Sequence, residues 1–220
     1  QDGDEIVTCN LEHGSVLVPS HFQKLRHGVN VKVLDMEPGE PKDSILDKIQ
    51  AAFTNRTRMV FLSHIEYSSG LRMPVMEIRQ MTAEKGIMLL LDGAQTAGHI
   101  ALNMKGLDCV FYSIPGQKWL LGPEGMGALY IRQDMISQVK PSQVAGRATV
   151  SNHNPHLIET VDDSMDKFLG TSSSVALHAG MLEAINFIQE IGTDEIENRD
   201  LDLAASFKTG LSEIPGVTVL

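Results

Sequence analysis

The fold of this 220-residue chain is best read from residues 87–95, which are Ile87-Met88-Leu89-Leu90-Leu91-Asp92-Gly93-Ala94-Gln95. The first five residues are all apolar, so a strand formed by them is apolar on both faces. This is typical of a parallel strand buried inside a sheet. The segment just before this run begins at Pro74 and ends at Gly86, which are typical first and last positions of a helix. A helix therefore leads into a buried strand here.

The same alternation of strand and helix patterns fills the first two-thirds of the chain. We expect strands at residues 6–9, 29–34, 59–62, 87–91, 109–113 and 126–131, and helices at residues 15–27, 43–53, 74–86, 173–191 and 194–212. This order predicts an α/β fold with three αβα layers around a mostly parallel sheet. Residues 140–166 are polar and are expected to form a long loop. Residues 217–220 are expected to begin another strand.

Composition and charge exclude several classes of partner. The net charge is −10, from 18 Lys and Arg against 28 Asp and Glu, which argues against nucleic acid or an anionic membrane as partner. No apolar run approaches the ~20 residues of a membrane span. Three of the first five residues are acidic, so no signal peptide is expected. Cys9 and Cys109 lie in apolar runs and suit a reducing, cytoplasmic location, although a disulfide between them remains open.

Asp92 and Lys118 together point to a chemistry. Asp92 directly follows the buried strand and is expected at the carboxyl edge of the sheet, where ligands bind in open parallel sheets. Lys118 lies in a turn rich in Gly and Pro at residues 116–127. A lysine can form an imine (Schiff base) with an aldehyde, and a carboxylate can hold a protonated ring nitrogen, which suits pyridoxal phosphate (PLP). Alternatively, Asp92 caps a helix and Lys118 is a solvated surface lysine.

Other residues near the predicted strand ends have two interpretations each. Gln95 can hydrogen-bond the phenolic oxygen of the cofactor, or it faces solvent. His13 follows the first strand and can stack on a planar cofactor, or it belongs to a helix N-terminus or the core. His64 and Glu66 can shape the site or only build their turn. The eight His and two Cys residues show no zinc spacing, so no metal site is expected.

Taken together, these motifs resemble one family. They are Glu12-His13, the turn at residues 63–70, Asp92-Gly93-Ala94-Gln95, Lys118-Trp119 and the glycine-rich residues 122–130. The match runs from Gly3 to the chain end. It resembles the class V aminotransferase family of fold-type-I PLP enzymes, which includes cysteine desulfurases, C–S lyases, isopenicillin-epimerase-like proteins and alanine–glyoxylate-type aminotransferases.

The resemblance implies a role for each matching residue. Lys118 would carry the cofactor as an imine and then move protons at the substrate Cα, and Asp92 would hold the pyridine nitrogen. Gln95 would contact the phenolic oxygen, His13 would stack on the ring, and Gln117 would bind the phosphate.

The resemblance also implies an assembly and a domain division. Gly170-Thr171 matches a pair that reaches the phosphate across a dimer interface, so a homodimer is expected. Residues 1–192 would form the PLP-binding large domain, incomplete at its N-terminus. Residues 193–220 would form a connecting helix and the start of a small C-terminal domain.

Some residues depart from the desulfurase pattern, and the reaction type stays open. Gln117 precedes the lysine where desulfurases usually have His, and Tyr67 stands where they usually have Asn. Against the family, segments before Gln1 and after Leu220 are missing. The leading hypothesis is a PLP enzyme acting on a small amino acid by transamination or by C–S lyase or desulfurase chemistry, with residues 1–220 inactive alone. The alternative is a non-catalytic relative or fragment with a role in assembly.

Overall fold

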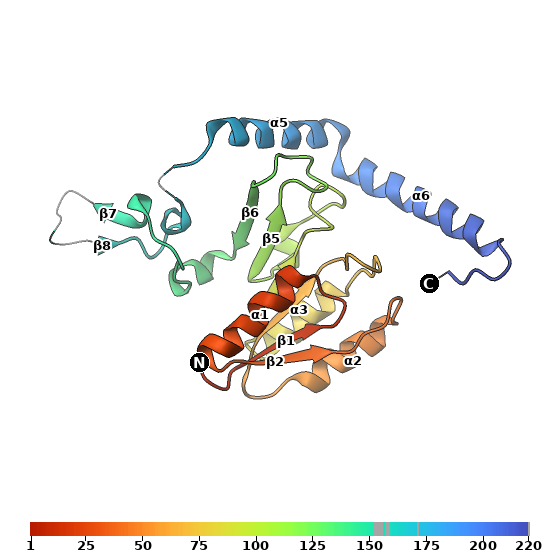
Figure 1. The fold of residues 1–220 in the computed structure, drawn as a ribbon, viewed down its shortest axis with the longest axis horizontal. Helices are drawn as coiled ribbons and strands as arrows, with labels where there is room; N and C mark the ends of the chain where they lie inside the picture. Colours follow the sequence, from red (N-terminus) through yellow and green to blue (C-terminus); the bar gives the residue numbers. More distant parts are fainter. Residues whose placement is uncertain (152–155, 157–158, 171, 220) are drawn as a thin grey trace.

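A six-stranded sheet forms the centre of the molecule (Figure 1). The computed structural model describes residues 1–151, 156, 159–170 and 172–219. The strands lie in the order β2-β1-β3-β4-β5-β6. Their bounds are Glu5–Cys9 (β1), Asn30–Leu34 (β2), Thr57–Ser63 (β3), Met88–Asp92 (β4), Phe111–Pro115 (β5) and Gly127–Ile131 (β6). Strands β1 to β5 pair in parallel, and β6 pairs antiparallel with β5. The predicted α/β fold with a mostly parallel sheet is confirmed.

Five of the six α-helices in the described residues occur where the sequence predicts them, and the short helix α4 was not predicted. They are Gly14–His27 (α1), Lys42–Ala52 (α2), Val75–Glu84 (α3), Met104–Leu107 (α4), Val175–Ile191 (α5) and Thr193–Ser212 (α6). Pro74 precedes the first residue of α3 rather than occupying it. Gly28 directly follows α1, and Gly86 lies two residues after the end of α3. Both glycines have positive φ angles, of 65° and 66°. This left-handed conformation is the usual way in which glycine ends a helix.

Two sequence predictions differ from the structure. The predicted loop at residues 140–166 contains short elements, which are η2 (Gly146–Ala148), β7 (Thr149–Ser151), β8 (Glu159–Thr160) and the start of η3 (Met165–Phe168). Residues 217–219, which the sequence predicts as the opening of a strand without partners, form no strand in the structure. Pairing with a neighbouring strand is what satisfies the backbone groups of a strand.

Strand β4 contributes to the packing on both faces of the sheet. Leu89 and Leu91 belong to the larger apolar cluster, in which Ile49 of α2 and Ile78 of α3 pack. Leu90 packs against the other cluster, on the opposite face. Residues that alternate along a strand point to opposite faces, so the uninterrupted apolar run of β4 is explained by its burial on both sides.

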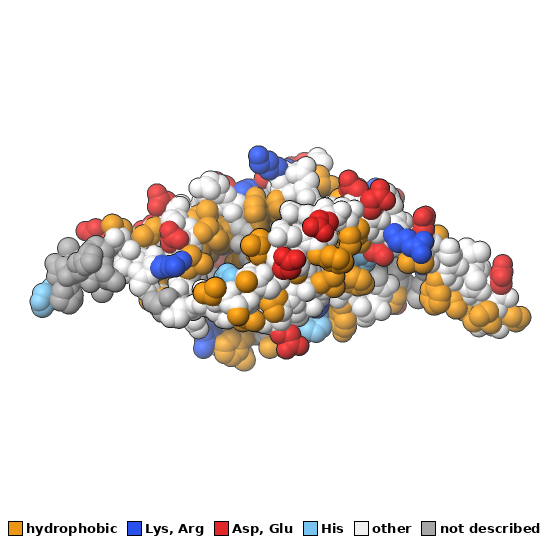
Figure 2. Space-filling model, turned by 90° about the horizontal axis from the view of Figure 1, so that it is seen from above, with side chains coloured by type: hydrophobic (Ala, Val, Ile, Leu, Met, Phe, Trp, Pro, Cys, Tyr) orange, Lys and Arg blue, Asp and Glu red, His pale blue; other side chains and the backbone are white. Residues whose placement is uncertain are grey.

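The last two helices lie outside this core. Figure 1 shows α5 above the β5–β6 pair and α6 leading away from the sheet. No described residue of α6 is buried. Leu203 and Phe207 in α6, and Ile214 just after its end, are each at least half exposed. Figure 2 shows hydrophobic side chains gathered at this end of the molecule. Among the described residues, no helix combines the length and apolar character that a membrane span requires.

We predict that Gly93→Ala destabilises the fold. A Cβ at Gly93 would overlap the ring of Tyr112 and lie 2.7 Å from the carbonyl oxygen of Ser113, and Tyr112 is fully buried. Overpacking of this kind costs roughly 1–3 kcal/mol, which a urea unfolding curve measures as a lower midpoint. The control is Gly210→Ala in α6, where a Cβ meets nothing within 4 Å. Equal midpoints for the two variants would contradict the prediction.

Candidate active site

The carboxyl ends of the parallel strands bring the predicted residues to one edge of the sheet. His13 follows β1, Asp92 ends β4, and Gln117 and Lys118 follow β5. All four side chains line one cavity of about 540 Å³. Residues from three separate parts of the chain therefore meet at the edge where parallel sheets bind ligands.

Asp92 is buried and has one carboxylate oxygen committed within the protein. Its Oδ1 accepts hydrogen bonds from Ser113 Oγ at 3.1 Å and from the backbone N–H of Ala94 at 2.9 Å. The bond from Ala94 shows that Asp92 also stabilises the turn that follows it, although no helix begins there, as the capping interpretation had expected. Within the described part of the chain, Oδ2 has neither a hydrogen bond nor an ion pair. This oxygen can accept a hydrogen bond from a ligand in the cavity.

Lys118 is half-buried, and its amine has no bonding partner among the described residues. Its turn is closed by backbone hydrogen bonds from Gly122 N to Gly116 O and from Gly116 N to Met126 O, each 2.8 Å long. Leu121 within the turn has a φ of 58°, which is uncommon for a residue with a side chain. The turn is thus rigidly defined, while the Lys118 amine remains available for chemistry.

His13 lies at the N-terminus of α1, as one interpretation of the sequence predicted. Its Nδ1 accepts a hydrogen bond from the backbone N–H of Ser15 at 3.1 Å, so the ring caps α1. The ring also packs edge-on against Tyr67, with 5.0 Å between the ring centroids. Since Nδ1 is an acceptor, the neutral ring carries its proton on Nε2. The same side chain lines the cavity, where one ring face can cover a planar ligand.

Gln95 stands beside the cavity and does not line it. Its side-chain oxygen Oε1 accepts a hydrogen bond of 2.8 Å from Trp119 Nε1. The amide nitrogen remains a donor, as the predicted contact with a phenolic oxygen requires. Thr171, the residue predicted to reach across a dimer interface, lies outside the described residues.

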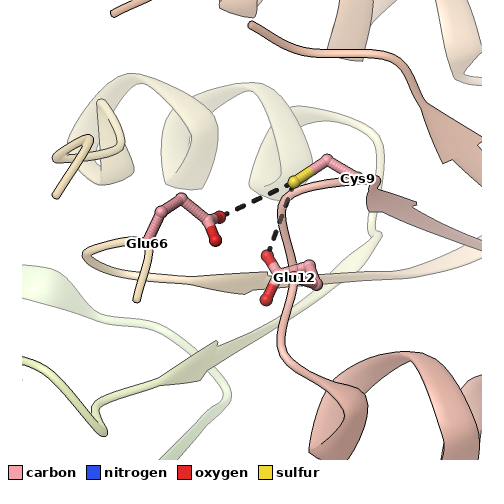
Figure 3. Close-up of side chains that lie close together, drawn as sticks. All are labelled: Cys9, Glu12 and Glu66. Carbon is pink, nitrogen blue, oxygen red and sulfur yellow. Dashed lines mark hydrogen bonds between the residues drawn. The ribbon is translucent and has the colours of Figure 1, made fainter. Parts of the chain in front are cut away.

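A buried group that the sequence did not reveal lies below this edge. Cys9 Sγ donates to Glu12 Oε1 at 3.7 Å and to Glu66 Oε1 at 3.6 Å (Figure 3). Glu12 also accepts from Ser63 N at 2.7 Å and from Ser63 Oγ at 2.6 Å. Glu12 and Glu66 follow β1 and β3, which are neighbours in the sheet but distant in sequence. Only the strand order brings these carboxyl groups together.

The protonation of this group decides whether it suits a metal ion. The ligand atoms of Cys9, Glu12 and Glu66 lie within 4.8 Å of one another, close enough to share an ion. Burial, followed by the nearby charge of Glu12, raises the pKa of Glu66 to about 9. Burial also raises the pKa of the Cys9 thiol and of Glu12. Without a cation, these raised pKa values favour protons shared within the group, and a metal ion could bind there only by displacing protons.

We predict that Glu66→Gln flattens the pH dependence of stability. The unfolded chain loses the Glu66 proton near pH 4.5, whereas the folded protein keeps it up to about pH 9. The free energy of unfolding should therefore fall as pH rises through this window, by at most about 1.4 kcal/mol per pH unit for a single group. Glutamine has no proton to lose, so the variant should lack this fall.

The measurement is a series of urea unfolding curves between pH 5 and pH 9. Glu190→Gln, which changes an exposed carboxyl of α5, is the matched control and should follow the unmodified protein. A Glu66→Gln variant with the same pH slope as that control would show that Glu66 is ionised in the folded state.

A second cavity of about 530 Å³ lies near the starts of α2 and α3 and beside α4. Its two cations are already paired, Lys42 with Glu77 at 3.0 Å and Arg72 with Glu197 at 2.9 Å. The buried His64 at its wall has a pKa lowered to about 4, chiefly by burial, so the ring is neutral near pH 7. The functional groups of this cavity are therefore occupied by internal contacts.

Several known proteins are similar to this chain. A family model described as aminotransferase class-V matches residues 1–220. A probable cysteine desulfurase of Xylella fastidiosa is 29% identical over 223 residues, which cover 98% of this chain and 50% of the relative. A probable cysteine desulfurase of Staphylococcus epidermidis is 30% identical over 221 residues, which cover 99% of this chain and 52% of the relative. The chain spans about half the length of these curated relatives.

Solved structures share the same architecture. The apo cysteine desulfurase of Thermococcus onnurineus NA1 superposes with a TM-score of 0.85 at 26% identity, covering 97% of this chain and 52% of the other. The cystine C–S lyase C-DES, in complex with its product cysteine persulfide, gives a TM-score of 0.87 at 25% identity, with coverage of 98% and 57%. A variant of C-DES carries glycine covalently linked to its PLP cofactor.

Proposed function

This chain belongs to the class-V aminotransferase family, and from that premise we propose that it forms the cofactor-binding part of a PLP-dependent enzyme that acts on a small amino acid. One observation carries the proposal: Asp92 and Lys118, whose amine has no partner among the described residues, line the same cavity at the carboxyl edge of the sheet. Neither residue alone would distinguish an active site from a turn. Together they supply the amine and the carboxylate that this cofactor requires.

The residues present fit the cofactor. A protonated pyridine nitrogen needs a carboxylate oxygen that can accept its hydrogen bond, and Oδ2 of the buried Asp92, which has no partner among the described residues, can provide one. An aldehyde needs an amine without a competing partner, which Lys118 provides. Gln117 lines the cavity next to the lysine and can donate its amide to a phosphate. When bound, PLP withdraws electrons from the substrate Cα and so weakens the bonds to that atom.

Each side chain then has a defined task. Lys118 would hold the cofactor, and its free amine would accept or return a proton at the substrate Cα. Asp92 would hold the proton on the ring nitrogen. The ring of His13 covers one side of the cavity and limits access of water. The amide nitrogen of Gln95 remains a donor for the phenolic oxygen.

Among the reactions of the family, we favour C–S bond cleavage of cysteine or a related amino acid over transamination. The relatives and solved structures described above are named as desulfurases and a C–S lyase. Neither cysteine of this chain is placed to accept sulfur, since Cys9 and Cys109 are both buried and neither lines the cavity. Burial raises the pKa of the Cys109 thiol to about 11. Free thiols of this kind suit a reducing compartment such as the cytoplasm.

We predict that Lys118 is the residue that becomes covalently attached to PLP. Borohydride reduction of the cofactor-loaded, full-length protein, followed by peptide mapping, should place the label on Lys118. Lys118→Ala should abolish both the label and the turnover of cysteine. Lys85→Ala, which removes an exposed lysine after α3, is the control and should retain both. Label at another lysine would refute the proposal.

In the same experiment, Asp92→Asn distinguishes the attachment of PLP to Lys118 from the turnover of the amino acid. The variant keeps Lys118 and the shape of the turn but cannot hold a positive charge on the ring nitrogen. Label on Lys118 should persist, while turnover should fall by orders of magnitude, because charge stabilisation in an enclosed site contributes several kcal/mol to the barrier. Near-normal turnover would show that Asp92 does not contact the ring.

We also propose that the full-length protein is a homodimer in which Thr171 completes the partner's phosphate site, and that residues 193–220 begin a separate small domain. The large apolar side chains exposed on α5 and α6 support an interface there, since extended apolar surface marks contact sites. Sedimentation should give a dimer, and Thr171→Ala should weaken PLP binding. An active, PLP-loaded monomer would contradict the dimer.

A further inference from the structure

His99 links helix α6 to the turn that carries Lys118. Its Nδ1 lies 3.1 Å from the backbone carbonyl oxygen of Gln95, and its Nε2 lies 2.9 Å from Asp200 Oδ2 in α6. The flat face of the ring stacks on Trp119, with 4.1 Å between the ring centroids and 19° between the planes. One side chain therefore contacts the loop after β4, the helix α6 and the residue next to Lys118.

Trp119 is held on its edge as well as on its face. Its Nε1 donates to Gln95 Oε1 at 2.8 Å, so the indole is fixed between His99 and Gln95. The backbone is equally close, because a Cβ at Gly98 would lie 2.5 Å from the carbonyl oxygen of Trp119. The loop at residues 95–99 thus packs against the lysine turn through both backbone and side chains.

Helix α6 contacts the same loop at a second point. Glu197 Oε2 accepts a hydrogen bond of 3.0 Å from Ala101 N, and Glu197 Oε1 pairs with Arg72 Nη1 at 2.9 Å. Glu197 and Asp200 are three residues apart, so they share one side of the helix. Both ring nitrogens of His99 face oxygen atoms, one of the Gln95 backbone and one of the Asp200 carboxylate, so the ring is held from two sides.

We propose that His99 is a positioning residue for Lys118: anchored to Asp200 of α6, it fixes Trp119 and thereby the turn that presents the lysine amine. Its catalytic consequence rests on the proposed function, whereas the contact itself does not. Loss of the ring should loosen the turn, expose the half-buried Lys118 and disturb its alignment with a reacting atom. Misalignment of about 1 Å costs on the order of 10²-fold in rate.

The first readout needs no cofactor. Trp119 is the one tryptophan of the sequence, and a stacked imidazole quenches indole emission. His99→Gln should therefore raise the emission and shift it to longer wavelength, and Asp200→Asn should do so more weakly. Asp202→Asn makes the same chemical change on an exposed residue of α6 and should leave the spectrum unaltered. If the protein carries further tryptophans outside these residues, subtraction of the Trp119→Phe spectrum isolates the signal.

The second readout tests the lysine directly. Labelling with acetic anhydride and peptide mapping should show Lys118 reacting several-fold faster in His99→Gln and Asp200→Asn, while Lys85 on the same molecules reacts at an unchanged rate. In the full-length, PLP-loaded protein, the two variants should lower kcat by about 10- to 100-fold with little change in KM. Altered emission with unchanged Lys118 labelling, or unchanged emission, would overturn the positioning role. A failure of the unmodified protein to bind PLP would instead overturn the proposed function.

Discussion

One row of residues across three strands holds the candidate site together. Asp92 is in register with Ser63 of β3 on one side and with Ser113 of β5 on the other. Ser113 donates to the Asp92 carboxylate, and Ser63 donates twice to Glu12, the residue before His13. These contacts fix the carboxyl ends of the strands relative to one another at the site. A slip of one residue would turn each of these side chains to the other face of the sheet.

The same edge concentrates carboxyl groups, and no ion pair to any of them occurs among the described residues. Glu12, Glu66 and Asp92 are all buried, and the charge of Asp92 contributes to the raised pKa of both glutamates. A proton retained on Glu66 stabilises the group in the absence of such an ion pair, because unpaired buried charge is costly. A cationic ring next to Asp92 would find a potential that favours it.

Much of the fold and of the candidate site could be predicted from local sequence patterns. The features that could not be predicted depend on contacts between distant parts of the chain. The apolar run before Asp92 predicts a buried strand, and the glycines around Lys118 predict a tight turn. Both residues can therefore be identified as candidate site residues from the sequence. The pairing of Glu12 with Glu66 depends on β1 and β3 being neighbours, which no local pattern states. The contact of His99 with Asp200 likewise could not be predicted from a local pattern, because Asp200 lies about a hundred residues later in the sequence. Residues 217–219 have the apolar composition of a strand, but strand formation also needs a partner.

The left-handed Leu121 has a consequence for how the site assembles during folding. A residue with a side chain holds such a conformation only when its surroundings enforce it, at a cost of order 1–3 kcal/mol. Here Met181 of α5 packs where Gly116 and Gly122 lack side chains, at both ends of the turn. The strained turn and the docked helix therefore stabilise each other. The lysine pocket is expected to form cooperatively with α5, as a late step in folding rather than as a property of the sheet alone.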